Sequence, residues 1–180
     1  MKILLIIVMA ISLYADAKEK MFTLYKNKKY LEACDTGFDN FKENIRDEEY
    51  MSLYAFSCLN IDLLDRLSMP ISTLKYSEEA RSNAAYFSVI LMQKKLLYHA
   101  LIDGYDISGL NLPTTDYILS KVFDLYTKVK NDKKEEVYTF EDKDDSQQKY
   151  KLYLLKNDRI NKIVIEEYKN TTLIKKHIYW

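Results

Sequence analysis

The chain changes its hydrophobic period near residue 131, and this single change limits it to a fold in which helices precede strands. Before that point, apolar residues recur every three or four positions, as in amphipathic helices. Beyond it, β-branched and aromatic residues come in short runs between polar connections. Because the chain has only 3 glycines and 2 prolines, long irregular segments are not expected. We therefore predict an α+β fold, with an N-terminal α-helical hairpin array of about five helices followed by a small C-terminal antiparallel β-meander.

The predicted α-helical domain covers residues 18–130. Within it, the acidic residues that begin at Asp47 suit the start of a third helix, which Pro70 is expected to end. Ser77 is suited to cap a long fourth helix, and Gly104 is suited to end it. The apolar side chains of this fourth helix form a band broad enough for the centre of a bundle.

The fifth predicted helix follows Pro113 and has the most regular spacing of apolar residues. These residues are Ile118, Val122, Leu125 and Val129. Lysines near the expected end of this helix suit the negative pole of its dipole. A charged linker over residues 131–136 is predicted to separate the helical domain from the strands.

Three or four strands are predicted within residues 137–180, and they form the β-meander. The runs are Val137 to Glu141, Tyr150 to Leu155, Ile160 to Tyr168 and Leu173 to Trp180. Asn170 tolerates the left-handed geometry of a tight turn. One face of the meander is expected to gather Tyr138, Phe140, Leu152, Leu154, Ile163, Ile165, Ile174 and Ile178. A sheet of this size is not stable alone, so it is predicted to pack on the helices.

Residues 1–17 have the layout of a secretory signal peptide. The charge of Lys2 precedes an almost unbroken apolar run, and small residues follow at Ala15 and Ala17. Cleavage is expected after Ala15 or after Ala17. The apolar run is shorter than the roughly 20 residues that a membrane-spanning helix needs, which makes an uncleaved anchor the weaker interpretation. The leader therefore predicts a periplasmic or secreted protein with no stable membrane insertion after cleavage.

The chain contains 2 cysteines, Cys34 and Cys58, and an even number in an exported protein favours a disulfide. The two residues lie at equal sequence distances on either side of Arg46, in the predicted turn between the second and third helices. If these helices fold back antiparallel, both cysteines reach the same height of the hairpin. A structural disulfide is therefore favoured over two buried free thiols. It is also favoured over a redox or metal-binding pair, which would more often show CxxC spacing or nearby histidines.

The rest of the sequence indicates no catalytic, cofactor-binding or metal-binding residues. The 2 histidines, His99 and His177, fall on different predicted elements, and an exposed position in the last strand is expected for His177. No glycine-rich loop is present to bind phosphates. The acidic stretch Glu141–Asp145 lacks two obligatory residues of a calcium loop, so it is interpreted as a solvated hairpin connection.

The segment from Tyr25 to Ala33 resembles the turn between the two helices of a tetratricopeptide repeat. In that family a tyrosine and the alanine three residues later, here Tyr30 and Ala33, pack the helix pair together. The resemblance is limited to this hairpin, because a second repeat about 34 residues later would need a small residue near Leu67. It implies a protein-binding or scaffolding role rather than catalysis.

The charges balance at 27 basic and 27 acidic residues, which argues against nucleic acid or anionic lipid as a primary partner. We predict an exported, non-enzymatic protein-interaction or scaffolding module that binds another envelope protein or peptide. An exposed sheet edge or a groove between helices would be the means. Two alternatives stay open. One is a small-ligand or lipid-binding module that uses Phe87, Leu91, Tyr98 and the apolar face of the sheet. The other is an enzyme whose site combines His99 with scattered Asp, Glu and Tyr.

Overall fold

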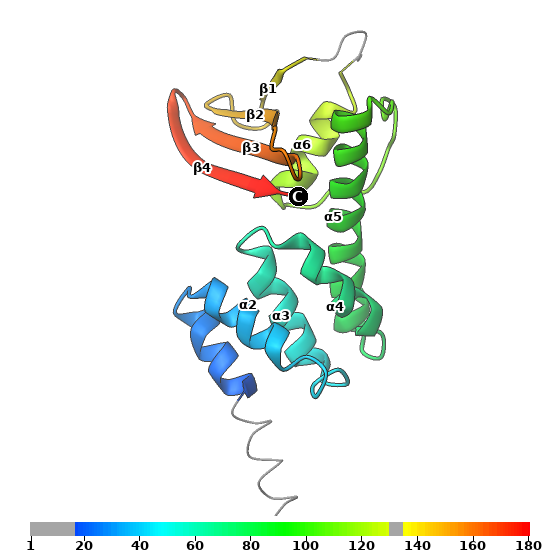
Figure 1. Ribbon diagram of the computed structural model, residues 1–180, viewed down its shortest axis with the longest axis vertical. Helices are drawn as coiled ribbons and strands as arrows, with labels where there is room; N and C mark the ends of the chain where they lie inside the picture. The colour runs from blue at the N-terminus through cyan, green and yellow to red at the C-terminus, as the bar shows by residue number, and fades with distance from the viewer. Residues whose placement is uncertain (1–16, 130–134) are drawn as a thin grey trace, which may run out of the picture. The chain divides into compact units, whose positions relative to one another are not determined.

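Helices occupy the N-terminal two thirds of the described chain and a four-stranded antiparallel sheet occupies its C-terminus, which confirms the predicted α+β class (Figure 1). The structure, a computed structural model, describes residues 17–129 and 135–180. The predicted leader up to residue 16 and most of the predicted linker 131–136 lie outside these residues. The chain divides into two compact units, one ending at Ser88 and one beginning at Val89, and each has buried apolar side chains of its own.

The first unit is helical. A helix over residues 17–26 is followed by α2 (Tyr30–Asp39), α3 (Glu48–Leu59), the 3₁₀ helix η1 (Leu64–Leu67), α4 (Ser68–Thr73) and the start of α5 (Glu78–Asp103). Gly37 of α2 lies so close to Tyr54 of α3 that a Cβ atom at this position would fall 2.4 Å from the tyrosine ring. Tyr50 donates its hydroxyl to the backbone oxygen of Gly37 at 3.2 Å. The absence of a side chain at Gly37 therefore allows α2 and α3 to approach closely.

The predicted continuation of the third helix to Pro70 is wrong, because α3 ends at Leu59. Asp62 adopts a positive φ of 64°. This left-handed residue lets the amide of Leu63 donate to the carbonyl of Cys58 at 3.0 Å. Such a bond satisfies a carbonyl that the helix end would otherwise leave without a partner.

Pro70 lies inside α4 rather than at a helix end. It is the third residue of that helix, and a proline is tolerated in the first turn because its missing N–H would have no partner there. Leu64 and Leu67, which the sequence assigned to the third helix, belong to η1 and are buried there. The first unit therefore turns through η1 and α4 where one long helix was expected.

α5 begins and ends where the sequence predicts. The Oγ atom of Ser77 accepts a hydrogen bond from the amide of Ala80 at 3.1 Å, the geometry of an N-cap. Gly104 follows the last helical residue with a φ of 72°, a conformation that glycine adopts without strain. The helix contributes its first part to the first unit and the rest to the second. Among the described residues, no helix combines the length and apolar character that crossing a bilayer requires.

α6 (Ile118–Tyr126) begins later than the sequence predicts. The expected start directly after Pro113 is wrong, because side chains hold the intervening residues in a turn. The amide of Thr115 donates to the Oγ atom of Ser120 at 2.8 Å, and the amide of Tyr117 donates to the hydroxyl of Thr115 at 3.3 Å. Serine and threonine hydroxyls compete in this way with helical backbone bonds.

The sheet has the strand order β1-β2-β3-β4, and all neighbours are antiparallel. Its strands are β1 (Val137–Glu141), β2 (Gln148–Leu155), β3 (Lys162–Lys169) and β4 (Thr172–Tyr179). The four predicted runs thus all form strands. Asn170, in the tight turn between β3 and β4, has a φ of 53°, as its turn-forming preference predicts.

The helices of the second unit cover one face of the sheet. The ring of Tyr126 in α6 lies 5.0 Å from the ring of Tyr138 in β1, and Tyr98 of α5 donates its hydroxyl to the backbone oxygen of Asn161 at 2.9 Å. Of the residues predicted for this face, five are buried and Leu154 is half-buried. The five are Tyr138, Phe140, Leu152, Ile163 and Ile165.

Ile174 and Ile178 do not belong to this face, and their predicted place in the core is wrong. The register between β3 and β4 shifts between Glu167 and Tyr168, where β4 contains one residue more than β3. A bulge of this kind moves the following side chains of the strand to the opposite face. Ile178 therefore pairs with Val164 on the outer face, and Ile174 is 62% exposed.

Glu48, the first residue of α3, ties this helix to the segment before α5. Its carboxylate accepts the backbone N–H groups of Lys75, Tyr76 and Ser77 at 2.9, 2.6 and 2.9 Å. These bonds, of which the one from Tyr76 is the strongest, lower the pKa of Glu48 from 4.5 to about 2 because they favour the charged form. The stability that this carboxylate contributes is therefore present above pH 4.5 and is lost as the pH falls toward 2.

We predict that Glu48→Gln weakens the fold at neutral pH and flattens the loss of stability between pH 4.5 and pH 2. An amide oxygen accepts weaker bonds than a carboxylate, and it does not titrate. Urea unfolding at a series of pH values measures both effects. Exposed Glu43 supplies the control variant Glu43→Gln, which should keep the acid profile of the unmodified protein. An unchanged acid profile for Glu48→Gln would show that this carboxylate does not carry the effect.

Candidate functional site

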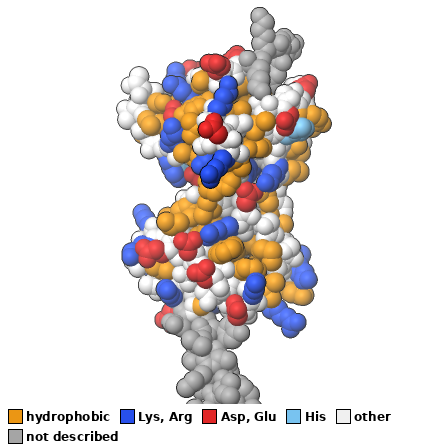
Figure 2. Space-filling model, viewed as in Figure 1, with side chains coloured by type: hydrophobic (Ala, Val, Ile, Leu, Met, Phe, Trp, Pro, Cys, Tyr) orange, Lys and Arg blue, Asp and Glu red, His pale blue; other side chains and the backbone are white. Residues whose placement is uncertain are grey.

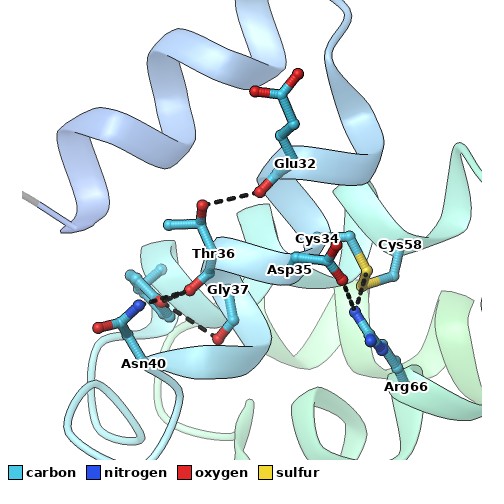
Figure 3. Close-up of polar contacts among 9 residues, drawn as sticks. Glu32, Cys34, Asp35, Thr36, Gly37, Asn40, Cys58 and Arg66 are labelled. Carbon is cyan, nitrogen blue, oxygen red and sulfur yellow. Dashed lines mark hydrogen bonds and ion pairs between the residues drawn. A yellow bond between two sulfur atoms is a disulfide. The ribbon is translucent and has the colours of Figure 1, made fainter.

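Cys34 of α2 and Cys58 of α3 form a disulfide, with their Cα atoms 4.9 Å apart (Figure 3). The cysteine pair that the sequence predicts is therefore at bonding distance. The pair meets because α2 and α3 are antiparallel, so that Gly37, which lies later in α2, contacts Tyr54, which lies earlier in α3. Both cysteines are 0% exposed. A dissolved thiol therefore cannot reach the sulfurs unless the hairpin opens, which favours a structural role over a redox role.

Arg66 of η1 closes over this disulfide (Figure 3). Its Nη1 atom donates to Oδ1 of Asp35 at 2.8 Å and to Sγ of Cys34 at 3.2 Å. Its guanidinium also lies 4.5 Å from the ring centroid of Phe38, which stays 46% exposed. Sequence reasoning missed Arg66, because this position was assigned to a continuous third helix. The arginine fastens η1 to α2 and covers the sulfurs.

His177 is 3% exposed and faces the helices, so its predicted exposed position is wrong. The bulge in β4 changes the face on which this side chain lies. Its Nε2 atom lies 2.7 Å from Oε1 of Glu167, and its ring stacks on that of Tyr179 at 6.1 Å. Oriented imidazole–carboxylate pairs of this kind also occur in catalytic sites. Here the two residues come from the adjacent strands β3 and β4. The pair joins β4 to β3.

α5 contributes two buried polar side chains to the second unit. The Nζ atom of Lys94, which is 2% exposed, donates to the backbone oxygen of Trp180. The Nε2 atom of Gln93, which is 0% exposed, donates to the backbone oxygen of Pro113 at 2.9 Å. These bonds fasten α5 to the end of the sheet and to the loop before α6. Polar groups buried in this way are costly unless they are hydrogen-bonded.

His99, the residue on which an enzymatic site was predicted to depend, is largely exposed on α5. Its Nδ1 atom lies 2.8 Å from Oδ2 of Asp103, one helical turn away, and its ring stacks on Tyr105 at 4.6 Å. No further carboxylate reaches His99 in the described part of the chain. This arrangement is that of a surface pair on a helix. Within the described residues, the groups gathered at His99 are Asp103 and Tyr105, both close to it in the sequence.

The acidic stretch between β1 and β2 forms a turn. Oδ1 of Asp142 accepts the amides of Asp144 and Asp145 at 2.9 and 3.2 Å, and Oδ2 accepts the hydroxyl of Tyr150. These bonds, with that from Tyr150 the largest cause, lower the pKa of Asp142. Within residues 17–129 and 135–180, no group of three or more side chains is arranged to hold a metal ion.

The residues predicted to bind a small ligand belong to different units. Phe87 is buried in the first unit, with its ring 4.9 Å from that of Phe56. Tyr98 belongs to the second unit, where its hydroxyl binds the backbone of Asn161. The second unit has instead a cavity of about 510 Å³ beside β1 and β2. It is lined by Leu101, Glu135, Glu136, Val137, Tyr138, Tyr153, Leu154 and Lys156.

β4 is an edge strand, and its outer side has no strand partner within the described residues. It pairs with β3 alone, so alternate residues direct their backbone N–H and C=O groups away from the sheet. The first five residues, Thr172–Lys176, are all exposed. Leu173 is 47% and Ile174 62% exposed. We call residues Thr172–Lys176 the β4 edge. It offers hydrogen-bonding groups and apolar side chains on the same strip.

One face of the molecule mixes both signs of charge with apolar side chains. Figure 2 shows lysines or arginines, acidic residues and hydrophobic residues interspersed over the face in view. A basic surface that binds nucleic acid would instead be dominated by one sign of charge. The β4 edge differs locally, because residues 170–180 contain lysines but no acidic residue.

Comparison of this chain with protein-family models, with curated proteins and with solved structures gives no match.

We predict that replacing both cysteines, by Cys34→Ala with Cys58→Ala, lowers the free energy of unfolding by about 3 kcal/mol. The bond closes a loop between residues separated by 24 positions, and this restriction of the unfolded chain is lost in the variant. Urea unfolding with and without reductant measures this difference in the free energy of unfolding. The double variant is its own control, since reductant should leave it unchanged. If reductant leaves the unmodified protein equally stable, the disulfide does not stabilise the hairpin.

Proposed function

We propose that this protein is an exported, non-enzymatic interaction module of the cell envelope. It binds an extended segment of another envelope protein, which adds as a further strand beside β4. The observation that carries this proposal is the β4 edge, an exposed strip on which apolar side chains lie beside unpaired backbone groups. Strand addition uses such an edge, because backbone bonds supply affinity and side chains supply specificity.

Export is part of the proposal. The leader over residues 1–17 predicts it, and the disulfide between Cys34 and Cys58 is compatible with an oxidising compartment. In the cytosol, thiols are kept reduced and the bond would be unusual. The mature protein would begin after Ala15 or Ala17 and act in the periplasm or outside the cell.

The resemblance to a tetratricopeptide repeat fits the same role. We propose that the helix over residues 17–26 and α2 form the helix pair of such a unit. Ala33 is 0% exposed, and the rings of Tyr25 and Tyr30 are in contact at 5.2 Å, which supports close packing at this turn. Leu31 of α2 is 56% exposed and would belong to a second contact surface.

A second candidate is a small-ligand or lipid-binding module. It is favoured by the cavity of about 510 Å³ in the second unit, because ligand pockets usually measure roughly 300–1,000 Å³. Apolar walls at Leu101 and Leu154 with charges at Glu135 and Lys156 suit an amphipathic ligand. A ligand that stays bound to the exported protein in native mass spectrometry would favour this candidate.

We predict that a photo-reactive residue at Thr172 in the full chain, exported in its own envelope, forms an adduct with a partner protein. Position 172 lies on the β4 edge, where an added strand would pass. The matched control is exposed Lys42, where no adduct is expected. A third position, Leu31, reports on the helical surface.

Mass spectrometry of the adducts identifies the linked segment of the partner. A discrete extended segment linked to position 172 supports strand addition. Adducts at position 42 as abundant as those at 172, or adducts at 31 alone, would contradict binding at the β4 edge.

A further inference from the structure

We propose that the β4 edge selects an acidic partner, an extended segment in which two adjacent carboxylate residues precede apolar residues. This inference rests on the proposed strand addition and specifies the chemistry of the added strand. It follows from the positions of the lysines on β4, from the absence of acidic residues on β4 itself, and from the effect of the same lysines on a second copy of this chain.

The lysines lie at the middle of the strand. Lys175 and Lys176 are consecutive, so their side chains project to opposite faces of the sheet. Lys175 is exposed, and no ion pair to it is found in the described part of the chain. Lys176 already contacts Glu166 at 3.4 Å and keeps a side-chain exposure of 42%. An added strand would therefore meet a lysine on each face of the sheet, at two neighbouring positions along β4.

The acidic residues nearest to these lysines are already engaged. Oε1 of Glu166 accepts the hydroxyl of Tyr153 at 2.8 Å, and its Oε2 accepts that of Tyr168 at 2.7 Å. Glu167 binds His177 at 2.7 Å. Both carboxylates lie on β3, where they are the cross-strand neighbours of Lys176 and Lys175, so neither occupies the side of β4 on which a strand would be added. β4 itself carries these two lysines and no acidic residue.

The same charges disfavour a second copy of this chain as the occupant. Two β4 strands paired antiparallel about their common centre would place Lys175 of one copy opposite Lys176 of the other. Like charges directly opposite each other in a sheet are destabilising. Lysines on edge strands prevent self-pairing in many proteins for this reason. An acidic strand removes the repulsion, because it supplies the counter-charges.

The apolar part of the edge sets the order of residues in the partner. Leu173 and Ile174 precede the lysines and are 47% and 62% exposed. An antiparallel strand, which continues the pattern of this sheet, meets the lysines first and the apolar pair afterwards. From its N-terminal side, the partner segment therefore has two acidic residues, opposite the lysines, and then two apolar residues.

Binding of synthetic peptides to the full chain, purified with its disulfide intact, tests the proposal. The peptides are as long as β4, 8 residues, and share a centre of Glu-Glu-Val-Val, Gln-Gln-Val-Val or Lys-Lys-Val-Val. We expect the acidic peptide to bind about tenfold more tightly than the neutral one at low salt, since exposed ion pairs contribute modestly. The preference should shrink as salt rises. An acidic peptide with an N-methyl group on every backbone amide has no N–H on either edge to pair with a strand, and it should not bind.

Charge reversal at the edge is the second part of the test. Lys175→Glu should weaken the acidic peptide about tenfold and strengthen the basic one. Lys42→Glu makes the same change of net charge in the first unit and should alter neither. Circular dichroism verifies that both variants keep the fold. If Lys175→Glu does not fold, Lys175→Gln replaces it as a milder change that removes the positive charge.

The outcomes separate the two proposals. Equal binding of the acidic, neutral and basic peptides, with none by the N-methylated peptide, overturns the acidic preference and leaves strand addition standing. No binding by any peptide, or equal binding of the N-methylated one, overturns strand addition itself. Competition by polyphosphate as strong as by the acidic peptide also overturns the inference, because it indicates unspecific attraction of anions.

Discussion

The register between β3 and β4 determines which side chains of the last strand are buried and which stay exposed. The bulge at Glu167 and Tyr168 turns His177 and Tyr179 toward the helices, where both are nearly inaccessible to solvent. Their burial anchors the C-terminal half of β4. The N-terminal half, which begins at Thr172, extends beyond this anchor and stays exposed. A strand that is held at one end and open at the other is suited to accept an added strand.

The first unit is held together in a different way. Its central contact is the α2–α3 hairpin, in which Gly37 permits close approach and the disulfide fixes the relative height of the two helices. Arg66 and Glu48 then attach the irregular segments after α3 to this hairpin. All of these contacts join residues far apart in the sequence. The hairpin therefore holds in place the short segments that follow α3, which are η1, α4 and the residues before α5.

Much of the fold could be predicted from local sequence signals, and the failures have physical causes. Ser77 and Gly104 mark the ends of α5 because capping depends on residues at the ends themselves. The end of α3 could not be placed in this way. It depends on Asp62 in a left-handed conformation, and aspartate gives a weaker signal for it than glycine. Pro70 was misleading for a similar reason, since its effect depends on where in a helix it falls.

The site was less predictable than the fold. Cys34 and Cys58 could be paired because helix geometry converts their equal distances from the turn into equal height. Ile174, by contrast, was assigned to the core by alternation, which fails when one extra residue enters a strand. Arg66 was missed because its role depends on the turn after α3. Sequence patterns thus predict contacts within regular elements and miss those that depend on irregularities between them.

Addition of a partner strand requires above all that the β4 edge is open in the free protein. Amide hydrogen exchange resolved residue by residue by NMR tests this directly. We predict rapid exchange for the amides of Thr172–Lys176 that point away from β3. Slow exchange is expected for those that point toward β3, and for Val164 and Ile165 within β3, which are 0% exposed. Uniformly slow exchange on both sides of Thr172–Lys176 in the free protein would contradict an open edge.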